Sequence, residues 1–183
     1  MDTILPYKKL IAAGSLALGG LLVFIASFMK FLIMKADGET EKYNLKKISE
    51  MAGDIDETKF NPHALFIIFA ILGIVAAAGI FIGNNFMVGL DKICLFAGAA
   101  IGIIIFIIVL VYGSSGALGD VKDYMDSMKA LIYAFSEESV KVSNGPGYVL
   151  TIIGSLIMIL GSGFAIVLDF IAPSGNQTQY PQA

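Results

Sequence analysis

Few residues of this chain could carry chemistry, and they do not combine into a catalytic set. The single histidine, His63, has no Cys or Asp at metal-ligand spacing, which favours a surface or interfacial role over a metal site. The single cysteine, Cys94, cannot form an internal disulfide and fits a small apolar packing residue better than a reactive thiol. The glycine-rich segment 113–119 lacks the lysine of a phosphate-binding loop. We therefore predict that the chain is not an enzyme and that it holds no metal or cofactor.

Charged side chains lie at the ends of the apolar segments of the sequence and not inside them. Asp91 and Lys92 lie between two such segments, and Asp169 follows the last one. Two interpretations stay open here: an ion pair between Asp169 and the Asp91-Lys92 turn, or simple helix-end charges. Charged residues inside a membrane usually mark proton relays or substrate sites, so their absence from these segments argues against proton-coupled transport.

The elements that must position these residues are four uncharged apolar segments of about 20 residues, each long enough to cross a hydrocarbon core of about 30 Å. Mean hydropathy is +0.81, and charged residues make up 15% of the chain, against about 25% in soluble domains. The composition predicts an all-α integral membrane protein, a four-helix transmembrane bundle of two helix–loop–helix hairpins. We expect one domain over 1–172 and a disordered polar tail over 173–183. The predicted spans are 10–29, 64–83, 93–112 and 148–168.

Small residues recur four positions apart on each predicted helix. Such pairs let helix backbones approach closely in lipid. We expect Gly79 and Gly98 to lie at similar depth on either side of the short 84–92 turn, so that these two helices are held together. Packing within the chain and an oligomer interface are both open. The predicted packing residues are Ser15, Gly19, Gly79, Gly83, Gly98, Gly102, Gly161 and Ala165.

Both long loops show the spacing of a short amphipathic helix, over 41–52 and over 120–136. In the first loop, Thr40 is the predicted N-cap. These helices could cover the end of the bundle or form a surface for a partner. The apolar face of the second helix is the candidate partner surface, made by Tyr124, Met125, Met128, Leu131, Ile132 and Phe135.

The sequence indicates contact with a lipid bilayer, not with nucleic acid, because the net charge is −3 and the pI is near 5.0. We expect a multi-pass protein of the cell membrane. Counting lysines places the long loops, which hold most of them, in the cytoplasm. Those lysines are, however, spaced as if they formed the solvated sides of small folded elements, in which case they do not report the orientation. We therefore favour the opposite orientation, with both termini cytoplasmic.

Two functions follow from these features. The first is a non-enzymatic scaffold or accessory subunit that contacts other membrane subunits, or further copies of itself, through its loop helices. The alternative is a homo-oligomeric pore lined by the Gly and Ser/Thr positions of the first or fourth helix. The layout of four spans with a long first loop resembles that of claudin-like tetraspan proteins. Because the loop cysteines and the loop tryptophan motif of that family are missing here, no property of the family is carried over.

Overall fold

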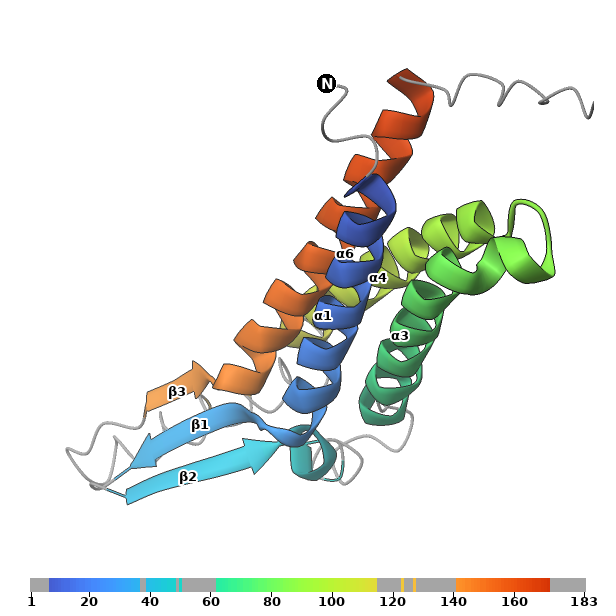
Figure 1. Ribbon diagram of the computed structural model, residues 1–183. Coiled ribbons are helices and arrows are strands. Elements are labelled where there is room, and N and C mark those ends of the chain that lie inside the picture. The colour runs from blue at the N-terminus through green and yellow to red at the C-terminus, as the bar shows by residue number, and fades with distance from the viewer. Residues whose placement is uncertain are drawn as a thin grey trace, which may run out of the picture.

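The computed structural model describes residues 7–36, 39–48, 50, 62–114, 123, 127 and 141–171 of the 183-residue chain (Figure 1). Among the described residues, α1, α3, α4 and α6 are each long and apolar enough to cross a membrane. The prediction of four long apolar helices is therefore confirmed. In chain order the elements are α1 (Lys8–Phe28), β1 (Lys30–Ala36), β2 (Glu39–Asn44), α3 (Pro62–Phe86), α4 (Leu90–Ser114), β3 (Lys141–Asn144) and α6 (Pro146–Ile171).

Local sequence explains where these helices begin and end. Both α3 and α6 start at a proline, whose fixed φ suits a first helical position and whose missing N–H is not needed there. Between α3 and α4 the chain reverses through Gly89, whose φ of +84° favours glycine. At the end of α1, Met29 adopts an extended conformation that leads directly into β1.

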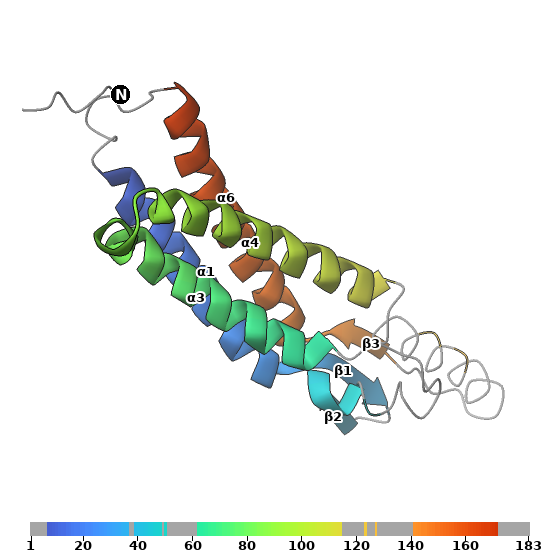
Figure 2. The same ribbon diagram turned by 90° about the vertical axis from the view of Figure 1, so that its right-hand side faces the viewer.

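The four helices form a ring in which each packs mainly against two neighbours. α1 packs against α6 and α3, and α4 packs against the same two helices from the other side, so α1 and α4 lie diagonally opposite (Figure 2). The first turns of α1 and α4 lie at one end of the bundle, together with the last turns of α3 and α6. The three strands lie at the opposite end (Figure 1).

The bundle buries many small side chains beside larger ones such as Leu16 and Met158, and it exposes many other large apolar side chains. On α1 the buried positions include Ala12, Ala13 and Gly19, whereas Leu18 and Leu21 are exposed. The same pattern continues on α3 and α4, where the exposed positions are mostly Ile, Leu, Val and Phe. A large apolar surface is rare on a water-soluble monomer, and it suits helices whose outer faces meet lipid.

A three-stranded antiparallel sheet, with strand order β2-β1-β3, lies at one end of the bundle. The central strand pairs Lys35 with Thr40 on one side and with Lys141 on the other. This sheet was not predicted from the sequence. It joins parts of the chain that are far apart, since Ser143 Oγ donates a hydrogen bond to the Ile33 carbonyl, 110 positions away.

The predicted helix over 41–52 is wrong at its start, because residues 41–44 belong to β2. Helical structure covers 45–48 and 50, and its buried residues are Leu45 and Ile48. Thr40 is therefore a strand residue. Asn44 takes the capping role, since its Oδ1 accepts a hydrogen bond from the Lys47 backbone N–H at 2.9 Å. The strand forms because residues 39–44 pair along β1 and because Thr40 and Tyr43 favour extended structure.

Most of the second predicted loop helix lies outside the described residues. Only Asp123 and Ser127 of 120–136 are described, and both are helical, with Ser127 Oγ donating to the Asp123 carbonyl at 2.8 Å. The tail over 173–183 is also outside the described part. The same holds for the six residues of the candidate partner surface, Tyr124, Met125, Met128, Leu131, Ile132 and Phe135.

Candidate functional site

Glycines bring α1 and α6 into direct backbone contact. A Cβ placed on Gly19 would meet the Gly154 carbonyl oxygen at 2.5 Å, and one placed on Gly154 would meet the Gly19 carbonyl oxygen at 2.8 Å. Further along the same interface, Gly161 packs on Ser15. At this separation neither helix has room for a larger residue, so the two backbones pack directly on each other.

The remaining predicted packing residues contact several helices, and Gly98 contacts a different helix from the one expected. Gly79 on α3 faces Cys94 on α4, but Gly98 does not face α3. A Cβ on Gly98 would meet Leu16 of α1 at 2.5 Å, and one on Gly102 would meet Met158 of α6 at 3.0 Å. Gly98 thus points across the bundle to α1 and Gly102 points to the neighbouring α6, so neither of them faces α3.

Met158 lies at the centre of the bundle and is completely buried. Its side chain lies against Gly19 of α1, Gly73 of α3 and Gly102 of α4. A flexible thioether can fill an irregular space of this kind. Ala165 is also buried. Gly83 lies on α3, but its packing falls outside the part of the chain that the structure describes. Within the chain, therefore, small residues from three helices converge on one methionine of the fourth.

The buried hydroxyls of the helices mostly bond to their own backbone. Ser27 Oγ donates to the Val23 carbonyl and Thr151 Oγ1 donates to the Gly147 carbonyl, both at 2.9 Å. Ser162 Oγ is buried without a partner. A hydroxyl that donates to a carbonyl one turn back along its own helix has its hydrogen-bond donor satisfied. Among the described residues, no group of three His, Cys, Asp or Glu side chains could hold a metal ion.

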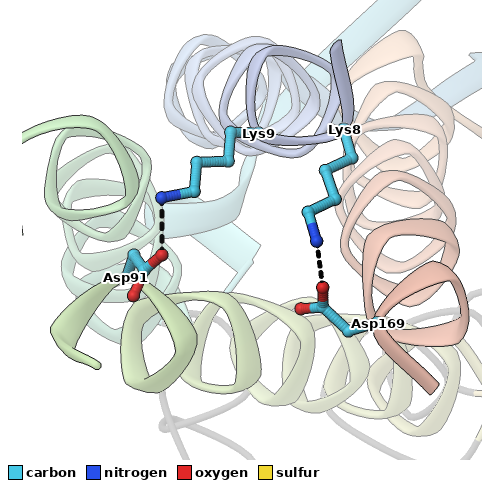
Figure 3. A network of polar contacts seen from close by, with 4 residues as sticks. All are labelled: Lys8, Lys9, Asp91 and Asp169. Carbon is cyan, nitrogen blue, oxygen red and sulfur yellow. Dashed lines mark hydrogen bonds and ion pairs between the residues drawn. The ribbon is translucent and has the colours of Figure 1, made fainter. Parts of the chain in front are cut away.

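Two ion pairs close the end of the bundle opposite the sheet (Figure 3). Lys8 of α1 pairs with Asp169 of α6, and Lys9 of α1 pairs with Asp91 of α4 at 2.7 Å. Consecutive helical residues point about 100° apart, so the adjacent lysines reach two different helices. An ion pair between Asp169 and the Asp91-Lys92 turn, one of the two interpretations left open above, is not what the structure shows. The partner of Asp169 comes from α1.

A cavity of about 400 Å³ opens beside these ion pairs. Its charged lining includes both ion pairs and Lys92, and its apolar lining includes Ile80, Leu95 and Ala165. All four helices and the turn before α4 contribute to it, so it combines a charged rim with an apolar wall at the end of the bundle.

At the other end, aromatic rings join the sheet to the helices. Phe31 of β1 is completely buried and stacks on Phe66 of α3, with ring centroids 6.4 Å apart. Its other edge meets Tyr148 of α6 at 6.5 Å. The Gly145 backbone N–H donates to the Phe31 carbonyl at 2.7 Å, and Gly147 lies against the Phe31 ring. One residue of the sheet is thus held by two helices and a backbone hydrogen bond.

Tyr43 of β2 is also buried at the sheet end of the bundle, and it has an unusual environment. Desolvation by burial raises the pKa of Tyr43 to about 12, and a hydrogen bond from its hydroxyl to the Glu41 carboxylate adds to the shift. Lys47 Nζ lies 4.9 Å from the centre of its ring, in a cation–π contact. Burial and the Glu41 carboxylate favour the neutral phenol, and the contact with Lys47 helps to fix the ring in place.

No protein-family model matches this chain, and no curated protein sequence matches it either.

Proposed function

We propose that this chain is a non-enzymatic scaffold or accessory subunit of a membrane complex. In this proposal the four helices cross the cell membrane, and the sheet, together with the segment 120–136, forms a platform at the membrane surface that contacts other subunits. The observation that carries it is the attachment of the sheet through Phe31, which packs against two helices at once. A platform fixed to membrane helices can hold a partner in a defined position.

The charge pattern of the sheet supports this assignment. Lys35 and Lys42 are exposed on β1 and β2, and Lys46 and Glu50 form an exposed ion pair at 3.8 Å. Of these residues Lys42 lies on the edge strand β2, where a charge discourages indiscriminate pairing with other strands. The selective surface is then the apolar face predicted for 120–136.

The alternative, a homo-oligomeric pore, has less support. Its proposed lining was the Gly and Ser/Thr positions of the first or fourth helix. In the structure Ser15 and Gly19 pack against Gly161 and Gly154, in the interface between α1 and α6. These four residues join two helices of one subunit and are therefore not available to line a channel between subunits.

Site-specific photo-crosslinking tests the scaffold proposal. A photoreactive residue at Met128, on the predicted apolar face, should give one discrete adduct of higher mass in intact cells. The same residue at Lys129, on the predicted polar face, should give none, because partner contact is confined to the apolar side. Purified protein in a planar bilayer should pass no current. Reproducible unitary conductance, or equal crosslinking at the two positions, would contradict the proposal.

We further propose that both termini lie in the cytoplasm and that the sheet lies outside. The lysines that favour the opposite orientation include Lys35 and Lys42, which are exposed on a folded sheet. In a Cys94→Ala background, Ser143→Cys on β3 should react with a membrane-impermeant maleimide added to intact cells. Lys92→Cys, at the other end of the bundle, is the matched control and should be protected. Labelling of Lys92→Cys and protection of Ser143→Cys would reverse the assignment.

A further inference from the structure

The cavity at the ion-paired end has the composition of a site for a molecule that is both charged and apolar. Its volume is about 400 Å³, and its lining combines Lys9, Asp91 and Lys92 with Ile80 and Leu95. Neither the scaffold proposal nor the helix packing requires a cavity here.

The charges around this cavity favour an anion. Lys8 and Lys9 are each neutralised by an aspartate, whereas Lys92 is exposed and takes part in none of the ion pairs found among the described residues. Lys9 is itself 44% exposed, so its ammonium group can be shared with a ligand. The rim thus has a net positive potential.

The apolar side of the cavity adjoins a turn that is unsuited to water. Phe86, Met87 and Val88 follow one another at the end of α3, and they are 79%, 51% and 95% exposed. Val88 also lines the cavity. Three consecutive exposed apolar residues at the end of a membrane-length helix indicate that this turn lies at the boundary between headgroups and acyl chains. The cavity therefore lies at the level where lipid phosphates are found.

We propose that this cavity binds the phosphate of an anionic phospholipid. Lys92 and Lys9 would bind the phosphate oxygens, and the start of an acyl chain would lie along Ile80, Val88 and Leu95. A soluble phosphate compound offers the same anionic group, but it has nothing to place against the apolar wall. The site is independent of the scaffold proposal, because neither its lining nor its ligand involves the sheet or the segment 120–136.

Native mass spectrometry of the full chain in a neutral detergent tests this site. The protein is titrated separately with phosphatidylglycerol, phosphatidylcholine and glycerol phosphate. Wild-type protein should retain phosphatidylglycerol in preference to the other two. Lys92→Gln should weaken that retention about tenfold, as expected for the loss of one contact with a charged group. The matched control, Lys141→Gln, removes a lysine from β3 at the other end and should retain the lipid like wild type.

Each outcome of this experiment decides the question. Retention of phosphatidylglycerol that depends on Lys92 and not on Lys141 supports the lipid site. Equal retention of phosphatidylglycerol and phosphatidylcholine would overturn it, and so would an unchanged affinity in Lys92→Gln. If glycerol phosphate bound as tightly, with the same dependence on Lys92, the ligand would be a soluble phosphate and the lipid assignment would be wrong.

Discussion

Replacing Gly19 by leucine is expected to separate α1 from α6 and to destabilise the bundle by about 3 kcal/mol or more. A Cβ at this position would meet the Gly154 carbonyl oxygen at 2.5 Å. The obstacle is backbone of the neighbouring helix, which cannot change rotamer to make room. Either the two helices move apart, losing contacts along their whole interface, or the new side chain is forced into a strained conformation. A lower thermal unfolding temperature in detergent, followed by loss of the monodisperse chromatographic peak, would report the change.

Gly14→Leu is the matched control for this experiment. Gly14 lies on the same helix, is exposed, and has nothing within 4 Å of an added Cβ. Leucine there would face outward and should leave the unfolding temperature close to that of wild type. If Gly19→Leu and Gly14→Leu behaved alike, direct contact of the α1 and α6 backbones would not be what stabilises the bundle.

The long helices could be predicted from the sequence because their signal is local. A run of about 20 apolar residues in lipid must satisfy its own backbone hydrogen bonds, and a helix does so within the segment. The direction of individual small residues could not be predicted in the same way. Gly98 points to Leu16 on a different helix from the one expected, because its neighbour depends on how each helix is rotated in the bundle. The spacing of residues along one helix does not determine how that helix is rotated about its axis in the bundle.

The pairing of β1 with β3 was missed for the opposite reason, since its hydrogen bonds join distant parts of the chain. The apolar residues at the start of β1 follow directly after the first helix, so they resemble a continuation of it. The partner strand β3 begins only at Lys141. In the first loop, Leu45 and Ile48 do occupy buried helical positions. The wrong start of that helix came from assigning the cap to Thr40 and not to Asn44, although both residue types cap helices.

The two ends of the bundle are stabilised by different physical interactions, and this difference bears on function. At the ion-paired end, Lys8 and Lys9 join α1 to α6 and α4 through charges that water and lipid headgroups can reach. At the sheet end, the connection is a buried aromatic ring, Phe31, which is insensitive to salt. A charged ligand can therefore act on the ion-paired end by competing for these charges. The sheet end, in contrast, is held in position by packing. A scaffold needs the second property where its partner binds.

Phe31→Ala is expected to release the sheet from the helices while leaving the four-helix ring in place. Truncating a buried phenylalanine typically costs about 3–5 kcal/mol. Here the change removes the ring contacts with Phe66 and Tyr148 and leaves a cavity above Gly147. Because the α1–α6 contacts at Gly19 and Gly154 do not involve this ring, the loss should stay local. Hydrogen exchange should become faster across β1 and β3, and fastest of all at the Gly145 amide, which donates to the Phe31 carbonyl.

Phe28→Ala provides the comparison, because it removes the same side chain three residues earlier. Phe28 is 59% exposed, and its ring contacts are with Phe24 and His63 at the outer surface of the bundle. Exchange in the sheet should then remain as slow as in wild type. Unchanged protection of Gly145 in Phe31→Ala would show that strand pairing alone fixes the sheet. The platform would then be free to move relative to the membrane helices, and the scaffold proposal would lose the observation on which it depends.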